Sequence, residues 1–268
     1  RVAVLDQGQT ATGGRVAERI WKRLAAGNDF RLLDRGASRA AADGVGYRGS
    51  LNLTLGEARD LGAALGGDFY LTGDAQVIRR SSSSRPIYYE AYASIFLVST
   101  RSGKLLLWER PAATSDGDAS AAENELFARL DETIARFREA ILRADAGEPQ
   151  ERAEEMLRDA VPIEDVPDEG DAGAKNFRPP QPYRRLSPHY PESAARAEAE
   201  ATVDAVAWIG TDGEVSRVEI VRWAGFGLDE ETSATIHRMH FRPAIRDDTP
   251  VPVRALFRYN FRRPPKNQ

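Results

Sequence analysis

Residues 239–261, "MHFRPAIRDDTPVPVRALFRYNF", decide the fold of the C-terminal part of this chain. The pattern predicts that a helix ends near Met239 and that an Arg-Pro turn and a pair of aspartates follow it. Beyond the turn, apolar and polar residues alternate: one face carries Val253, Ala255, Phe257, Tyr259 and Phe261, and the other carries Arg254, Leu256, Arg258 and Asn260. A period of two with one apolar face predicts a strand that helices cover on one side.

The segments before this strand predict a small domain with a regular order of elements. "YPESAARAEAE" (190–200) favours a short helix after a proline. Two strand-like segments, 201–210 and 214–223, flank an Asp-Gly turn. "GLDEETSATIHRMH" (227–240) favours a second helix, with acidic residues in its first turn, where the helix dipole stabilises them. Residues 183–268 are therefore predicted to form an α-β-β-α-β domain.

Residues 1–144 predict an α/β domain with a mixed sheet. Stretches rich in aromatic and branched residues predict strands at 1–6, 30–35 and 68–78 and a hairpin at 87–109. Apolar residues at helical spacing predict helices at 13–27, 54–67 and 121–144. The middle helix begins with Thr54 and Glu57, the spacing of a capping box.

Between these two parts, residues 145–182 are acidic, rich in proline and glycine, and poor in aromatic residues. This composition is typical of a linker, and one short helix at 149–160 is compatible with it. The overall expectation is a two-domain α+β or α/β protein: an N-terminal mixed-sheet domain at 1–144, an acidic linker, and the small domain at 183–268.

Composition excludes several classes of function. The net charge of −4 over 268 residues argues against a general nucleic-acid binder. No apolar run approaches the ~18 residues that a membrane span needs, and the absence of cysteine excludes disulfides and thiolate metal sites. Because the chain begins at Arg1 rather than methionine, we expect that any signal or membrane anchor lies upstream.

Motifs for catalysis, cofactors and metals are incomplete, so no enzyme activity, cofactor or metal is predicted. The glycine-bearing loop 7–15 joins a strand to a helix, but it matches neither the P-loop nor the G-x-G-x-x-G pattern. A nucleotide-binding enzyme that uses this loop, with Asp34 near the ribose, remains an alternative. His237 and His240 are three residues apart on a helix but lack a third ligand, and Ser81–Ser84 lack a partner base.

A basic tail at 241–268 stands out against the negative total. Its seven basic residues, Arg242, Arg246, Arg254, Arg258, Arg262, Arg263 and Lys266, face only two acids. The charges could discourage aggregation of an exposed strand. They could also attract an acidic, extended peptide to the strand edge. Both interpretations stay open on the sequence alone.

Residues 183–261 resemble the C-terminal domain of the TonB family. The matching motifs follow in order: "HYPESA" (189–194), "DGEVSRVEIV" (212–221), "GLDEETSATI" (227–236), "HFRPAIRDDTPVPV" (240–253) and "FRYNF" (257–261). Two features depart from the family pattern. The strand segment "EATVDAVAWI" begins without the usual Gly-x-Val, and Asp248 stands where a turn glycine is common.

The resemblance implies a non-enzymatic periplasmic protein that transmits energy to an outer-membrane TonB-dependent transporter. Such proteins bind a transporter peptide as an added strand, through main-chain groups of a sheet edge. An anchor before the periplasmic part is also implied. The alternative is an envelope lipoprotein or scaffold that binds another protein or the cell wall without energy transduction. The residues expected to contact the partner are His189, Tyr190, Val253, Arg254, Ala255, Leu256, Phe257, Arg258 and Tyr259.

Residues 1–144 resemble, through looser motifs, the periplasmic α/β domains of the TolB amino-terminal and CsgG type. The motifs are "VAVLD", "FRLLDR" and "FYLTGD". This resemblance implies protein binding or assembly in the envelope rather than catalysis.

Overall fold

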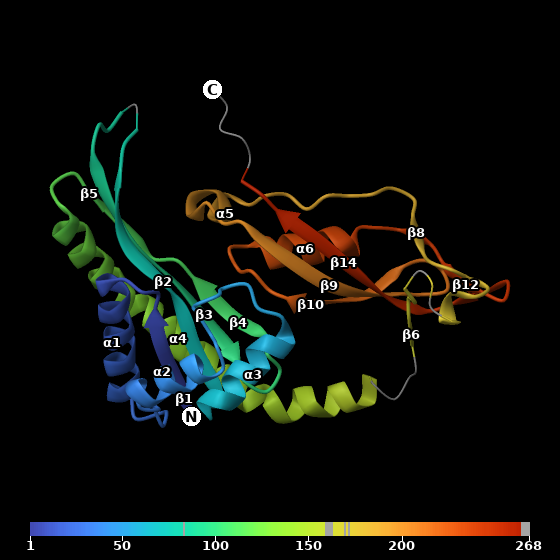
Figure 1. Ribbon diagram of the computed structural model, residues 1–268, viewed down its shortest axis with the longest axis horizontal. Coiled ribbons are helices and arrows are strands. Elements are labelled where there is room, and N and C mark those ends of the chain that lie inside the picture. Colours follow the sequence, from blue (N-terminus) through green and yellow to red (C-terminus); the bar gives the residue numbers. More distant parts are fainter. Residues whose placement is uncertain (83, 159–162, 169, 171, 264–268) are drawn as a thin grey trace. The chain divides into compact units, whose positions relative to one another are not determined.

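A computed structural model describes residues 1–82, 84–158, 163–168, 170 and 172–263 of the chain (Figure 1). The chain divides into two compact units, Arg1–Pro149 and Gln150–Gln268. Each unit has its own sheet and its own hydrophobic core.

The first unit is built on a mixed, five-stranded sheet, as predicted. Strand β1 (Val2–Gln7) pairs parallel with β2 (Phe69–Arg80), which pairs antiparallel with β3 (Tyr88–Ser99). Strands β4 (Leu105–Glu109) and β5 (Ala112–Ser115) both pair antiparallel with β3. The hairpin predicted at 87–109 therefore forms from β3 and β4. In addition, all twelve residues of β2 pair with the twelve residues of β3.

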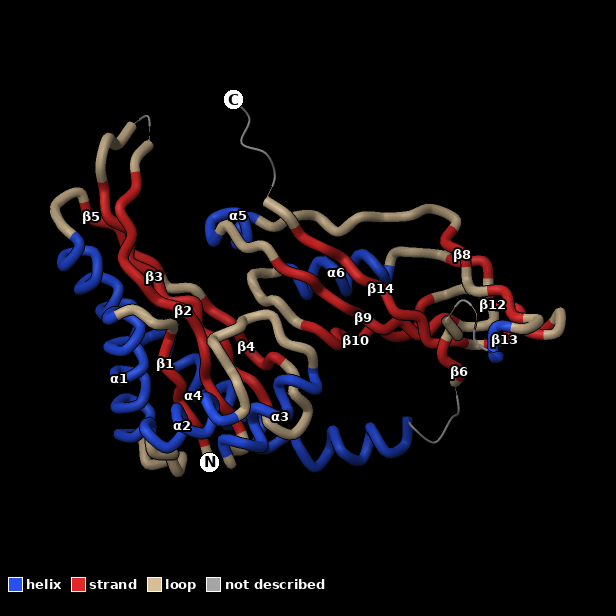
Figure 2. The backbone as a smooth tube through the Cα atoms, viewed as in Figure 1, coloured by secondary structure: helices blue, strands red, loops and turns tan. Residues whose placement is uncertain are grey.

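Helices α1 (Ala11–Ala26) and α4 (Ala119–Arg158) pack on one face of this sheet (Figure 2). The predicted apolar stripe of α4 is buried there: Leu126, Leu130, Ile134, Phe137 and Ile141. Helix α3 (Leu55–Leu65) begins with the predicted capping box of Thr54 and Glu57, and Gly66 ends it in the left-handed conformation. None of the helices in the described ranges has the length and apolar composition that crossing a membrane requires.

The prediction of a strand at 30–35 is wrong. This segment makes only an isolated bridge, between Val2 and Leu32. Asp34 instead begins helix α2 (Arg35–Gly44), because its carboxylate accepts a hydrogen bond of 2.8 Å from the N–H of Ala37. An aspartate at this position satisfies a free N–H of the first helical turn, so the chain leaves the sheet after one contact.

The described residues between 145 and 182 contain more secondary structure than a linker does. Helix α4 continues through Pro149 to Arg158, where a separate short helix was expected. Three two-residue strands then follow: β6 (Glu164–Asp165), β7 (Phe177–Arg178) and β8 (Gln181–Pro182), with a 3-10 turn η1 (Ala172–Ala174) between β6 and β7. They pair with β14, β12 and β11 of the C-terminal part. These long-range pairings connect much of the acidic segment to the second unit.

The second unit contains the predicted α-β-β-α-β order: α5 (Glu192–Ala197), β9 (Ala201–Ile209), β10 (Val215–Arg222), α6 (Leu228–His237) and β14 (Val253–Phe261). Its main sheet has the order β10-β9-β14-β6. Three short strands precede β14: β11 (Phe241–Arg242), β12 (Ala244–Arg246) and β13 (Thr249–Val251).

The turn between β9 and β10 is held by a close main-chain approach. Gly213 has a φ of +82°, and an added Cβ would lie 1.8 Å from the carbonyl oxygen of Phe241. The Phe241 N–H donates to the carbonyl of Gly213 at 2.9 Å. Only glycine meets both conditions without strain, so the Asp-Gly turn also fixes the start of β11.

Candidate functional site

The outer edge of β14 is the candidate site. The main sheet has a second edge at β10, but β14 is the strand that carries the alternating pattern and most of the predicted contact residues. On its inner side β14 pairs antiparallel with β9 over its whole length, from Val253 opposite Ile209 to Phe261 opposite Ala201. On its outer side β6 pairs in parallel with Val253 and Arg254 alone. The Val166 N–H donates to the carbonyl of Arg254 at 3.0 Å.

Past Arg254, the outer edge of β14 has no pairing strand within the described residues. Main-chain groups alternate between the two sides of a strand. Since the Arg254 carbonyl points to β6, the N–H and C=O groups of Leu256, Arg258 and Asn260 point the same way. These three residues form the open edge, a row of main-chain donors and acceptors available to a partner.

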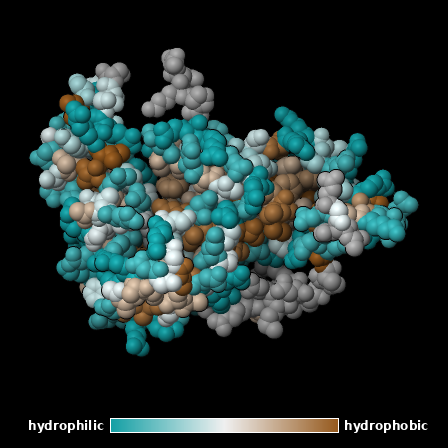
Figure 3. Space-filling model, in the orientation of Figure 1, coloured by the Kyte–Doolittle hydropathy of each residue, from teal (hydrophilic) through white to brown (hydrophobic). Residues whose placement is uncertain are grey.

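The two faces of β14 differ as the sequence predicted. The alternate residues from Val253 to Phe261 lie on the helix-covered face, where the Phe241 and Phe257 rings meet edge-on at 5.8 Å. On the opposite face, Leu256 is 61% exposed and lies across from Val206 of β9. Figure 3 shows hydrophobic residues gathered near the positions that Figure 1 labels β9 and β14. A guest strand would therefore meet apolar side chains beside the open edge.

His189 and Tyr190 lie near the far end of β14. The Tyr190 hydroxyl donates to the carbonyl of Ala199 at 2.7 Å, and its ring centroid lies 6.5 Å from that of Phe261. His189 is exposed. Burial raises the pKa of Tyr190. The structure thus places the Tyr-Pro motif next to the last residue of the edge strand, which the sequence could indicate only by resemblance.

Arg258 is held by a buried carboxylate on the neighbouring strand. Its guanidinium donates to both oxygens of Asp204, at 2.7 and 2.9 Å. Arg222 of β10 donates to the same carboxylate at 3.3 Å. Hydrogen bonding from Arg258, with its positive charge, lowers the pKa of Asp204, and Arg222 acts in the same direction. The three side chains form a row across β10, β9 and β14.

Most of the basic tail has acidic partners inside the second unit. Five arginines are paired: Arg246 with Glu164, Arg254 with Asp165, Arg258 with Asp204, Arg262 with Glu200 and Arg263 with Glu198. Arg242 lies over the ring of Tyr183, and Lys266 lies outside the described residues. The charge excess seen in the sequence is therefore balanced by acids that are distant in the chain, including two from the acidic segment.

Asp229 explains the Leu-Asp motif at the start of α6. Its carboxylate accepts hydrogen bonds from the N–H groups of Ala224 and Gly225, at 2.9 and 2.8 Å. Burial raises the pKa of Asp229 to about 7, although the two hydrogen bonds oppose this shift. From the sequence we predicted only a favourable interaction with the helix dipole; in the fold this side chain fixes the loop between β10 and α6.

The other motifs are used in local structure. Thr10 begins α1, and its hydroxyl accepts from the N–H of Gly13 at 2.9 Å, so the loop 7–15 satisfies donors that a phosphate would need. Asp34 caps α2. His240 lies beside Glu214 at 2.9 Å. Within the described ranges, no three side chains of His, Asp or Glu come together as possible metal ligands.

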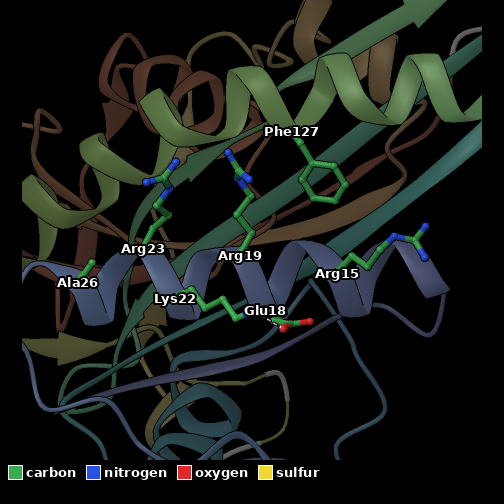
Figure 4. Close-up of a pocket in the computed structure, with 7 residues that line it drawn as sticks. All are labelled: Arg15, Glu18, Arg19, Lys22, Arg23, Ala26 and Phe127. Carbon is green, nitrogen blue, oxygen red and sulfur yellow. Dashed lines mark ion pairs between the residues drawn. The ribbon is translucent and has the colours of Figure 1, made fainter.

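A surface groove of about 460 Å³ in the first unit is lined by Arg15, Glu18, Arg19, Lys22, Arg23, Ala26 and Phe127. In Figure 4 the side chains of Arg19 and Arg23 extend from α1 towards α4. Arg19 and Arg23 both donate to Asp131, through Nε at 2.9 and 3.0 Å, and Lys22 pairs with Glu18 at 2.6 Å. The positive charges of this groove are compensated internally, so it is a weaker candidate than the edge of β14.

One family model matches part of the second unit. Residues 187–262 match the profile of a family described as "Gram-negative bacterial TonB protein C-terminal". A comparison with curated proteins found no match.

Three solved structures are similar to parts of the chain. The TonB C-terminal domain of Pseudomonas aeruginosa is 20% identical, with a TM-score of 0.28, over 37% of this chain and 94% of that chain. The LpoB C-terminal domain from Escherichia coli is 14% identical, with a TM-score of 0.30, over 42% and 81%. The lipoprotein GNA1162 from Neisseria meningitidis is 15% identical, with a TM-score of 0.34, over 50% and 96%. On the family match, residues 187–262 of this chain are a TonB C-terminal domain.

Proposed function

We propose that this protein is a non-enzymatic, periplasmic member of the TonB family that binds an extended segment of an outer-membrane transporter as an added strand on β14. A TonB C-terminal domain is an envelope module for binding other proteins. The transporter as partner, and energy transduction as the role, go beyond that general function and belong to the proposal.

The observation that supports the proposal is the open edge of Leu256, Arg258 and Asn260. Each of these residues offers one N–H and one C=O, so a guest strand of about five residues could form up to six main-chain hydrogen bonds. Such bonds give affinity with little demand on sequence, and the alternate side chains of the guest give specificity. Since β6 already pairs with Val253 and Arg254, the guest's pairing starts at Leu256.

The guest also meets side chains on both faces. On one face Leu256 is exposed, and on the other Phe257 and Tyr259 are half-buried. Apolar residues at alternate guest positions would therefore gain contacts that polar residues do not. Arg258 remains bound to Asp204 and acts on the guest through its main chain.

The test is a titration of the ¹⁵N-labelled full chain with peptides from the amino-terminal ends of TonB-dependent transporters. The amides of residues 256, 258 and 260 should shift most, because their N–H groups gain acceptors. A peptide of the same length with proline at alternate positions should bind weakly, since proline has no N–H to donate to the edge. The proposal fails if millimolar transporter peptide leaves the amides of 253–261 unchanged.

A further inference from the structure

The occupied part of the β14 edge holds a short acidic strand from the chain itself. Residues Ile163–Val166, with the sequence Ile-Glu-Asp-Val, are here called the resident strand. Its two central residues form β6 and run parallel to β14. The resident strand comes from the acidic segment, about 90 residues before the residues that it contacts.

The resident strand makes the kinds of contact that a bound peptide would make. The Val166 N–H donates to the outward carbonyl of Arg254 at 3.0 Å. Asp165 accepts two hydrogen bonds from the Arg254 guanidinium, both at 2.8 Å. Glu164 accepts one from Arg246 Nε at 2.9 Å. Val166 is half-buried against the core of the second unit. The resident strand is thus held by a main-chain hydrogen bond, by charged side chains and by an apolar side chain.

These contacts are few and exposed to solvent. The resident strand pairs with two residues only, and Pro167, which has no N–H, follows it. The side chains of Asp165 and Arg254 are 69% and 38% exposed. Ion pairs at such positions add little stability because water and salt screen them. A peptide that covers the edge from Arg254 to Asn260 could form more main-chain bonds than the resident strand does.

We propose that the resident strand is a displaceable internal ligand of the β14 edge, and that the partner is an acidic, extended peptide that replaces it. The peptide runs parallel to β14 and places two adjacent acids against Arg246 and Arg254. This inference rests on the proposed function, since it specifies the partner and the competition at the same edge. The apparent affinity for the peptide equals the intrinsic affinity multiplied by the fraction of molecules in which the resident strand has left the edge.

The test uses the full chain and a variant that weakens the resident strand, Glu164→Gln with Asp165→Asn. Both side chains are exposed, so the fold should persist. Asp168→Asn is the matched control, because Asp168 is an exposed acid of the same segment. The probes are two capped synthetic peptides, Ile-Glu-Asp-Val and Ile-Gln-Asn-Val, and binding is followed through the amides of 254 and 256.

The double variant should bind the acidic peptide about fivefold more tightly than the wild type or Asp168→Asn does, because the two exposed ion pairs together contribute about 1 kcal/mol. Adding Arg254→Gln should reduce the preference for the acidic peptide over the neutral one, and adding Arg246→Gln as well should remove it. Equal affinity in the wild type and the double variant would overturn the inference, and so would equal affinity for the two peptides.

Hydrogen exchange at Val166 separates this inference from the proposed function. Its amide is bonded to Arg254 only while the resident strand is in place. Loss of its protection when a transporter peptide binds supports the displacement. Binding at 256–260 with Val166 still protected overturns the inference and leaves the proposed function intact. Displacement by the acidic tetrapeptide, without binding of any transporter peptide, supports the competition and removes the transporter as the partner.

Discussion

Proline at position 256 should separate strand addition from side-chain contact. The Leu256 N–H points away from β9, so Leu256→Pro removes no bond of the existing ladder. The side chain is also lost, and Leu256→Ala controls for that loss. In Ala255→Pro the lost N–H faces β9, where Ala255 lies opposite Ala207. Leu256→Ala therefore removes an apolar contact alone. Leu256→Pro removes that contact together with an outward N–H, and Ala255→Pro removes an N–H that faces β9.

The expected magnitudes follow from these positions. Leu256→Pro leaves one guest carbonyl without its donor at a partly desolvated edge, which costs about 1–3 kcal/mol. That corresponds to a dissociation constant about 5- to 150-fold higher than for Leu256→Ala. The fold itself should lose less than about 1 kcal/mol, because Leu256 is 61% exposed. Ala255→Pro should instead lower the free energy of unfolding by about 2 kcal/mol or more.

Isothermal calorimetry with a transporter peptide gives the affinities, and urea unfolding gives the stabilities. A dissociation constant for Leu256→Pro equal to that for Leu256→Ala would refute the reasoning, because the outward N–H would then have no role in binding. A large loss of stability in Leu256→Pro would also refute it, by showing that this N–H already has an internal partner.

Two further substitutions test what holds the second unit together. Asp204→Asn should lower the free energy of unfolding at pH 7 by about 1–3 kcal/mol. Arg258 lowers the pKa of Asp204 in the folded state. The stabilisation by the Asp204 carboxylate is therefore complete above the unfolded-state pKa of about 4, and it is lost as the pH falls through the folded-state pKa. Urea unfolding at pH 7 and at pH 3 checks this, and a difference that stays constant with pH contradicts it. Gly213→Ala should cost about 1–3 kcal/mol or more, because φ is positive and the Cβ meets the Phe241 carbonyl. Urea unfolding at pH 7 measures this loss. The control Gly147→Ala lies in a helix with nothing within 4 Å of the new Cβ, so it should be neutral or stabilising in the same assay.

The sequence patterns correctly predicted the elements that are determined by interactions between residues close in the chain. The alternation from Val253 to Phe261 gave the correct faces of β14, because the helix layer selects one side of the strand. The Asp-Gly turn and the Thr54 capping box were also recognisable, since each satisfies main-chain groups within a few residues. The β14 edge as a site followed from family resemblance together with this alternation, and the choice of contact residues stays a prediction.

The errors arose from a local helix cap at 30–35 and from distant partners at 145–182. At 30–35 the apolar run resembled a strand, but Asp34 caps a helix and ends the contact with β1. At 145–182 the prolines and acids suggested a linker. Strong helix formers on both sides of Pro149 continue α4, and strands of two residues have no periodicity to detect. The partners of Arg246 and Arg254 lie more than 80 residues away, so no local signal could identify them.

The carboxylate of Asp204 has a geometric consequence for any guest. A slide of β14 by one position would turn Leu256 into the helix-facing layer, and a slide by two would separate Arg258 from Asp204. The register of β14 is therefore fixed, and the outward N–H groups of Leu256, Arg258 and Asn260 keep fixed positions in the sheet. A guest anchored in another structure can align with the edge only if its tether has a suitable length, so reach as well as sequence would determine which proteins can be recognised.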